Sequence, residues 1–220
     1  MRSRSRRPSV AVTIALAVAC ALGCSSTEHR EGELRPLWNG RDLDGWVQVL
    51  DSEWTVEDGV LLSRQDPAGR RDGESWLITE DDYEDFVLRV EFRVAPGGNS
   101  GVFLRDPVPR AERLAAADGG AAPWDAGFEA NINATDPSYP TGSIWALCRG
   151  TPALHRQGEW NEMTVRVEGP RVTTWVNGVL AADCETSRSS RGAIGLQRHG
   201  GAAYRDKVIE FRRIEIAEIR

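Results

Sequence analysis

Three polar residues, Glu129, Asn131 and Asn133, alternate with apolar residues in the segment 127–134. If this segment is a β-strand, successive side chains point to opposite faces, so one face carries a carboxylate and two amides in a row. This combination favours the floor of a cleft that binds a polar ligand, and sugars are the first class to consider. The alternative is an ordinary solvated strand face that binds nothing.

Aromatic residues lie close to this segment in the chain. Trp124, Tyr139 and Trp145 flank it, and an aromatic ring offers a flat surface for the C–H face of a pyranose. We therefore expect these three rings at the same cleft. Burial is the ordinary role of most tryptophans, and we expect five others in the core: Trp38, Trp46, Trp54, Trp160 and Trp175.

The beginning of the chain has the composition of an export signal. Four arginines precede the apolar run Val10–Leu22, which is too short and wrongly flanked for a membrane-spanning helix, and small residues then lead to Cys24. Residues 1–23 resemble a bacterial lipoprotein signal, with Cys24 lipidated and residues 24–34 as a polar tether. We expect an exported lipoprotein that faces the periplasm or cell surface and contacts the membrane only through its lipid. Ordinary signal-peptidase cleavage, with a soluble periplasmic product, is the alternative.

The charge balance of the chain is acidic. The formal net charge is -6, and removal of the four arginines in residues 1–23 (-6 minus 4) takes it to -10. Nucleic-acid-binding proteins usually carry a basic stripe, so nucleic acid is not an expected partner.

Two of the four cysteines are left for structural roles. Cys20 lies in the expected signal and Cys24 is the expected lipidation site, which leaves Cys148 and Cys184. An oxidising compartment favours a disulfide between them, and two buried free thiols are the alternative. Neither cysteine has zinc-like spacing.

The rest of the chain, residues 35–220, reads as one all-β domain. The segment Phe86–Val94 alternates cleanly, and Asp58-Gly59 and Asn177-Gly178 are typical of tight hairpin turns. The alternation slips near Arg212-Arg213, which predicts a β-bulge. Many short strands with regular turns predict a sandwich. Further strands are expected at Met163–Val167, Val172–Val176, Ala193–Leu196 and Val208–Ile219, and an insertion loop with one or two helical turns at Arg110–Asp118.

An ordered set of motifs covers nearly all of residues 35–220. In chain order the motifs are Leu37–Trp46, Trp54–Val60, Asn99–Arg105, Gly127–Ile132, Tyr139–Trp145, Gly158–Asn161, Trp175–Val179, Gly195–Gly200 and Glu210–Ile216. No single motif is decisive, but in this order they resemble the bacterial 3-keto-disaccharide hydrolase family.

The resemblance implies a concanavalin-A-like jelly roll, a sandwich of two antiparallel sheets with a concave carbohydrate-binding face. It also implies a hydrolase or lyase that acts on glycosides already oxidised at C3. A C3 ketone acidifies the C2 proton, so a base removes it while the C1–O bond breaks, and water then adds to the unsaturated product. Such a site needs a base, an acid for the leaving oxygen and a group that stabilises the keto oxygen.

The resemblance also assigns candidate residues. Glu129 falls on a recurrent Gly-aromatic-Glu position and His199 lies in a Gln-x-His-Gly motif, which makes them the candidate catalytic pair. The expected substrate-binding residues are Asn99, Ser100, Arg105, Asn131, Tyr139, Trp145 and Gln197. Asn131 stands where many relatives have glutamine, so its polar reach is shorter. The expected ligand is a small carbohydrate, a 3-keto-glycoside.

Metal dependence is left open by the sequence. Glu129, His199 and nearby aspartates offer ligand atoms suited to a divalent ion that polarises the keto oxygen, but the chain has no HxH or HExxH spacing.

Two other functions compete with the enzyme. A lectin-like module would bind sugar in the same cleft without cleaving it, since fold does not fix function. A surface lipoprotein would instead dock another protein, such as an oxidoreductase that makes the keto-sugar. The chain has no Gly-x-Ser-x-Gly elbow of a serine esterase.

Overall fold

The computed structural model describes residues 32–50, 54–64, 73–109, 111–112 and 127–220. The expected signal peptide, Cys24, Trp124 and most of Arg110–Asp118 lie outside these ranges. Within them, the regular structure consists of strands, one short 3₁₀ helix, Ala202–Tyr204, and the helical residues Ala111 and Glu112. None of the helical residues in this part of the chain forms a segment long and apolar enough to cross a membrane.

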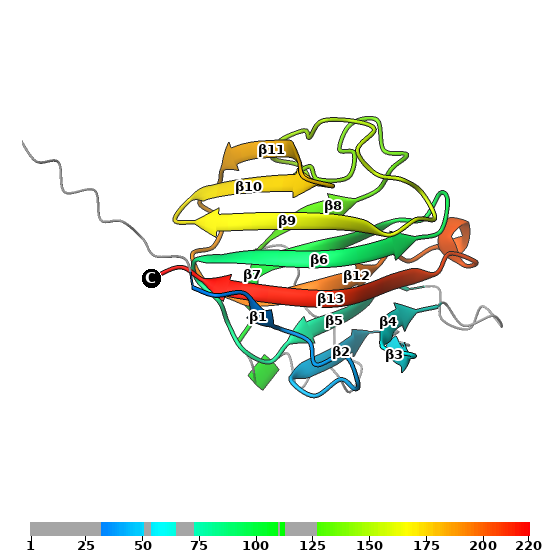
Figure 1. Cartoon of the computed structure of the whole chain (residues 1–220), viewed down its shortest axis with the longest axis horizontal. Helices are drawn as coiled ribbons and strands as arrows, with labels where there is room; N and C mark the ends of the chain where they lie inside the picture. Colours follow the sequence, from blue (N-terminus) through cyan, green and yellow to red (C-terminus); the bar gives the residue numbers. More distant parts are fainter. Residues whose placement is uncertain (1–31, 51–53, 65–72, 110, 113–126) are drawn as a thin grey trace, which may run out of the picture.

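The strands form two antiparallel sheets that lie face to face (Figure 1). The eight-stranded sheet has the order β11–β10–β9–β6–β13–β4–β3, with β1 beside β13. Its strands are β1 (Arg35–Pro36), β3 (Trp54–Glu57), β4 (Val60–Ser63), β6 (Phe86–Val94), β9 (Asn161–Glu168), β10 (Arg171–Val176), β11 (Val179–Glu185) and β13 (Ile209–Glu218). The five-stranded sheet has the order β2–β5–β12–β7–β8. Its strands are β2 (Trp46–Leu50), β5 (Ser75–Thr79), β12 (Ala193–Arg198), β7 (Ser100–Asp106) and β8 (Phe128–Ile132). The predicted all-β jelly-roll sandwich is confirmed.

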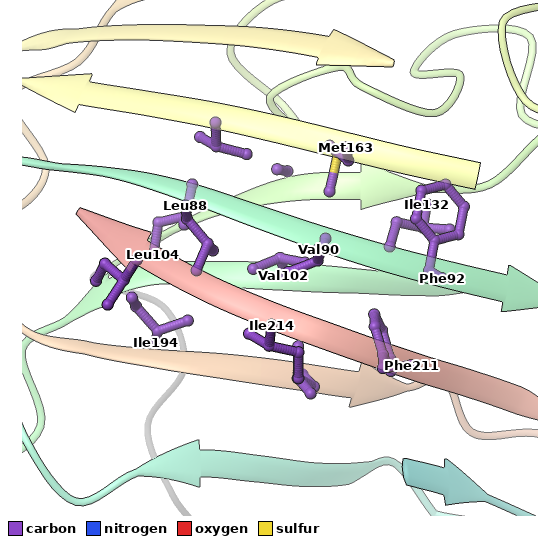
Figure 2. Packing of buried hydrophobic residues seen from close by; sticks show 14 of the residues in the cluster. Leu88, Val90, Phe92, Val102, Leu104, Ile132, Met163, Ile194, Phe211 and Ile214 are labelled. Carbon is purple, nitrogen blue, oxygen red and sulfur yellow. The ribbon is translucent and has the colours of Figure 1, made fainter. Parts of the chain in front are cut away.

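The core lies between the two sheets and is built by strand alternation. Every second residue of β6 from Phe86 is buried, and Leu88, Val90 and Phe92 point toward side chains of the opposite sheet such as Val102 (Figure 2). Full burial of one such side chain contributes about 1.5–3 kcal/mol. The two sheets therefore stabilise one another through their inner faces. The outward face of the five-stranded sheet is not needed for this packing.

The turn and bulge predictions are confirmed. Asp58 and Gly59 have φ values of 50° and 73° between β3 and β4, and Asn177 and Gly178 have 52° and 77° between β10 and β11. The register of β13 against β6 shifts between Arg212 and Ile214, where Arg213 has a φ of 46°.

The prediction that Trp160 and Trp175 are core residues is wrong. The Trp160 ring lies between the guanidinium groups of Arg93 and Arg212, whose Cζ atoms are 4.7 and 4.1 Å from the ring centroid. Trp175 is half-buried because it falls on the outward phase of β10, next to fully buried Val176. Trp38, Trp46 and Trp54 are buried as predicted.

The segment Tyr139–Cys148, called the strap below, runs beside β8 and covers that edge of the five-stranded sheet. The backbone N–H of Asn131 donates to the Ser143 carbonyl oxygen, and the backbone N–H of Trp145 donates to the Glu129 carbonyl oxygen, each at 2.9 Å. The strap therefore continues the sheet beyond its last strand.

The strap is also fastened to the other sheet. The Thr174 hydroxyl of β10 donates to the Gly142 carbonyl oxygen at 2.5 Å. Cys148 and Cys184 form a disulfide that joins the strap to β11, with a sequence separation of 36. The alternative of two free thiols, left open by the sequence, is thereby resolved in favour of the bond.

We predict that the double substitution Cys148→Ala/Cys184→Ala lowers the free energy of unfolding by about 3–4 kcal/mol, because the bond closes a long loop in the unfolded chain. Urea unfolding of both proteins, with and without reductant, measures this. Reductant is expected to destabilise only the wild type. Equal midpoints for the two proteins under oxidising conditions would contradict the prediction.

Candidate functional site

The outward face of the five-stranded sheet is ordered into rows by strand register. Gln197 of β12 pairs with Trp76 of β5 on one side and Gly101 of β7 on the other, and Gly101 pairs with Asn131 of β8. Paired residues point to the same face, so these four form the middle row. The row on one side of it, built in the same way, is Ile78, Gly195, Phe103 and Glu129.

The row on the other side lies just beyond the strand ends. The same registers place Glu74, His199, Asn99 and Asn133 next to one another. The His199 amide still donates to the Asn99 carbonyl oxygen at 3.4 Å, which continues the pairing of β12 with β7. Residues from four separate chain segments thus meet at one end of the face.

A cavity of about 510 Å³ opens above these rows. Its lining includes Glu129, His199, Asn99, Asn131, Trp145 and Gln197, all predicted from the sequence. The structure therefore brings together both candidate catalytic residues and four of the seven candidate binding residues.

Glu129 occupies the space above a glycine. A methyl group built at Gly101 would overlap the Glu129 Oε1 atom, so this carboxyl leans from its own row over β7 toward the middle of the floor. Burial raises the pKa of the Glu129 carboxyl to about 8, and the neighbouring Glu74 carboxylate acts in the same direction. At neutral pH the group is mainly protonated and can donate a proton.

His199 lies at the opposite side of the floor. Its Nδ1 atom is 2.8 Å from the Gly200 carbonyl oxygen, and because a carbonyl only accepts, Nδ1 carries a proton. The Nε2 atom lies 3.9 Å from Glu74 Oε1. Nε2 is therefore the nitrogen that faces the cavity as a proton acceptor, and Glu74 is close enough to stabilise the positive charge of the ring when Nε2 takes a proton.

The two amides in line with Glu129 have structural as well as ligand-facing roles. Asn131 Nδ2 donates to the carbonyl oxygen of Tyr139 and so holds the strap. Asn133 Oδ1 accepts from the Thr135 and Asp136 amides at 3.0 and 3.2 Å, which shapes the turn after β8. One amide atom of each residue is committed to the scaffold, which the sequence pattern alone did not reveal.

Gln197 and Ser100 differ in their access to the cavity. The Ser100 hydroxyl is fully buried and donates to the Gln197 carbonyl oxygen at 2.6 Å, so it joins β7 to β12 and does not line the cavity. Gln197 Oε1 is buried and, among the described residues, has no hydrogen-bond partner. This acceptor is suited to a ligand hydroxyl.

The structure does not bring Arg105 to the cavity, which corrects its expected role. The side chain is 1% exposed, and its guanidinium donates to the Glu84 and Gly169 carbonyl oxygens and to Asp85 at 2.5–2.7 Å. Arg105 has a φ of 51°, which breaks the alternation of β7, so the side chain leaves the outward face. It holds the loops at the end of the sandwich.

Tyr139 supports the site from outside the cavity. Its ring centroid lies 6.4 Å from that of Trp145, and its carbonyl oxygen is the one that Asn131 binds. The expected direct contact of Tyr139 with sugar is not supported by this position, because it is absent from the cavity lining.

His155 serves the strap and does not line the cavity. Its Nδ1 atom lies 2.9 Å from the hydroxyl of Thr141, and Phe92 packs edge-on to its ring. Burial lowers the pKa of His155 to about 4, so the ring is neutral at physiological pH.

The side chains of the cavity that sequence reasoning missed include Glu74, Trp76, Phe103, Asp136 and Arg188. Trp76 and Phe103 pack edge to face with centroids 4.8 Å apart and form an apolar part of the floor. Glu74 precedes the continuous apolar run Trp76-Leu77-Ile78, which lacks the polar–apolar alternation of β8 and gave no signal. Asp136 and Arg188 come from loops, where no such pattern exists.

Metal binding, left open by the sequence, depends on how the carboxylate, imidazole and thiol groups are arranged. Within this part of the chain, no group of three or more His, Cys, Asp or Glu side chains is arranged to hold a metal ion. The described residues therefore do not fit a closed metal site.

Comparison with known sequences gives two matches. Residues 33–217 match the model of the 3-keto-alpha-glucoside-1,2-lyase-like domain. A 73-residue stretch is 33% identical to a 3-keto-disaccharide hydrolase of Bacteroides thetaiotaomicron, and it covers 30% of this chain and 25% of that protein. The second match therefore spans only a quarter of the relative's length.

Comparison with solved structures shows the fold. A protein of Parabacteroides distasonis assigned as a glycosyl hydrolase has a TM-score of 0.64 at 21% identity, over 86% of this chain and 94% of that one. A Bacillus subtilis protein with a galectin-like fold gives 0.57 at 12% identity, over 87% and 100%. The carbohydrate-binding module CBM66 of Bacillus subtilis gives 0.54 at 17% identity, over 77% and 93%.

The raised pKa of Glu129 predicts a pH-dependent stability. The unfolded carboxyl ionises from about pH 4.5 but the folded one only near 8, so the stability of the wild type falls as pH rises between these values. The glutamine of Glu129→Gln cannot ionise. The free energy of unfolding of this variant should therefore rise relative to that of the wild type by up to about 1.4 kcal/mol per pH unit in this range. Urea unfolding from pH 4 to 9 measures the difference.

The exposed Glu159→Gln provides the control for this measurement. Its stability should follow the wild type at every pH. Parallel curves for Glu129→Gln and the wild type would show that Glu129 ionises normally in the folded protein.

Proposed function

The chain belongs to the family of 3-keto-alpha-glucoside-1,2-lyase-like domains, and from this premise we propose that it cleaves 3-keto-glycosides by elimination across C1–C2 followed by hydration. One observation carries the proposal. A half-buried carboxyl whose pKa is raised to about 8, Glu129, shares a sugar-sized cavity with an imidazole–carboxylate pair, His199 and Glu74.

The chemistry needs both kinds of group. Removal of the C2 proton by a base gives an enolate stabilised by the C3 ketone. Its electrons then form the C1=C2 double bond while the C1–O bond breaks and the leaving oxygen takes a proton from an acid. Addition of water, with hydroxide to C1 and a proton to C2, gives the free 3-keto-sugar. Each proton transfer is a step that a positioned acid or base accelerates, typically by 10²–10⁴-fold.

We assign these roles from protonation state and position. Glu129 is the acid, because its carboxyl is mainly protonated at neutral pH and leans over the middle of the floor. His199 is the base, because Nδ1 donates to the Gly200 carbonyl oxygen and leaves Nε2 to accept a proton, and Glu74 stabilises the charge that the ring gains. Gln197 Oε1 accepts a hydrogen bond from a hydroxyl group of the bound sugar.

The cavity itself suits a pyranose. Its volume of about 510 Å³ lies within the usual range of ligand pockets, about 300–1,000 Å³. Glu129, Asn131 and Gln197 bring polar groups to the floor, while Phe103, which pairs with Glu129 and packs edge-on against the buried ring of Trp76, makes an apolar area beside them. A sugar ring has both a hydroxyl-bearing edge and C–H faces, so it matches such a surface.

A carbohydrate-binding module without catalysis is the second candidate. The half-exposed indole of Trp145, 51% exposed at the cavity, favours binding as much as cleavage. The likeness to a carbohydrate-binding module concerns the fold only. Glu129 favours the enzyme, because a lectin gains nothing from a protonated carboxyl of perturbed pKa.

We further propose that the protein is exported and anchored through Cys24, and that a sugar oxidoreductase supplies its substrate. The disulfide between Cys148 and Cys184 supports an oxidising compartment. The oxidoreductase is required by chemistry, since the substrate must first be oxidised at C3.

Product analysis tests the proposed function. Incubation with 3-keto-trehalose and with unoxidised trehalose, each with and without EDTA, should release glucose and 3-keto-glucose from the oxidised sugar alone. Glu129→Gln and His199→Ala should each lower the rate at least about 100-fold, while Glu159→Gln should not. EDTA sensitivity would show a metal requirement.

Two results would contradict the proposal. Cleavage of both sugars would indicate ordinary glycosidase chemistry, in which the ketone has no role. Measurable affinity for either sugar without any turnover would indicate a binding module.

A further inference from the structure

The cavity continues past Glu129 on the side away from His199. His199 follows β12, and β7 and β8 separate it from the strap. The Trp145 amide donates to the Glu129 carbonyl oxygen, so Trp145 lies one strand spacing beyond Glu129. With about 4.8 Å between strands, the two ends of the floor are roughly 14 Å apart, room for more than one sugar ring.

We propose that the leaving group of the substrate is a sugar ring that lies over the strap on the indole of Trp145, while the keto-bearing ring lies over Gln197, on the His199 side of the Glu129 carboxyl. This inference rests on the proposed function and assigns the direction in which the substrate lies in the cavity. It also makes Trp145 a specificity-determining residue, since it contacts only the part of the substrate that departs.

The strap holds Trp145 as a fixed, exposed surface. The indole is 51% exposed, although neighbouring strap residues are tied down on both sides: Ile144 bridges both Ala130 of β8 and Cys148, and Cys148 is bonded to β11. A large aromatic surface left open to water on a rigid backbone is typical of a binding platform.

Asp136 makes the platform suited to a sugar. Its Oδ1 atom accepts from the amides of Ser138 and Tyr139 at 2.7 and 3.0 Å, which fixes the carboxylate at the cavity beside the strap. A fixed carboxylate that lines the same cavity as the indole offers an acceptor for a hydroxyl, while the indole offers a surface for C–H groups. A simple alkyl leaving group would use neither, and an aryl group would use only the indole.

The arrangement gives Glu129 a definite proton acceptor. Glu129 lies between the two ring positions, because its backbone adjoins the strap while its carboxyl leans over Gly101. The glycosidic oxygen joins the two rings at this point. When the C1–O bond breaks, that oxygen takes the proton of Glu129, the leaving sugar departs as an alcohol, and Glu129 becomes a carboxylate.

Three 3-keto-α-glucosides with the same keto ring test this inference: one with glucose as the leaving group, one with p-nitrophenol and one with methanol. Trp145→Ala should lower kcat/KM at least 10-fold on the first two substrates, mainly through KM, and less than 2-fold on the methyl glycoside. Trp145→Phe should retain most of the activity. Asp136→Asn, which keeps the Oδ1 contacts, should lower kcat/KM on the glucose substrate alone.

Leu147→Ala is the matched control, because Leu147 is a second exposed apolar residue of the strap, 36% exposed, that does not line the cavity. This variant should have the kcat/KM of the wild type on all three substrates. An equal loss on all three substrates with Trp145→Ala would place the indole against the keto ring and overturn the inference. No loss on any of them would do the same.

A binding measurement separates this inference from the proposed function. Calorimetry with D-glucose, the departing sugar, should show at least 10-fold weaker binding to Trp145→Ala than to the wild type or Leu147→Ala. Unchanged binding would overturn the subsite even in a protein that cleaves all three glycosides. If the wild type cleaves none of the glycosides but Trp145→Ala still binds D-glucose more weakly, the subsite is supported and the proposed reaction is contradicted.

Discussion

The close approach of the Glu129 carboxyl to the backbone of Gly101 is the contact on which the rest of the site depends. Any side chain at position 101 would occupy the space of the carboxyl, so the sheet provides a gap of the right size in the middle of an otherwise continuous row. Within this gap, burial disfavours the charged form and keeps the proton on Glu129. A proton donor is thus made by packing.

The strap makes this gap part of a cleft. It covers the β8 edge of one sheet and is fastened to β10 and β11 of the other through Thr174 and the Cys148–Cys184 disulfide. Exposed sheet edges invite unwanted pairing, and covering the edge also places Trp145 next to Glu129. The same segment therefore protects the fold and shapes the site.

Local pattern was enough to predict much of the fold and half of the site. Alternation identified β6 and the polar face of β8, turn dipeptides identified two hairpins, and a slip in phase identified the bulge at Arg213. Residues set by non-local register were out of reach: Glu74 faces His199 only because β5 pairs with β12. Arg105 was misplaced because a single positive φ turned its side chain off the face that its strand position predicts.

The ionisation of Glu129 tests the account most directly. The carboxyl resonance can be followed by carbon NMR from pH 4 to 10 and assigned by its absence in Glu129→Gln. The account predicts a midpoint at about pH 8, lowered in Gly101→Ala, where the added methyl displaces the carboxyl, and unchanged in Gly195→Ala, where a methyl has ordinary contacts. A wild-type midpoint near the ordinary value of 4.5 would contradict the assignment of Glu129 as the acid.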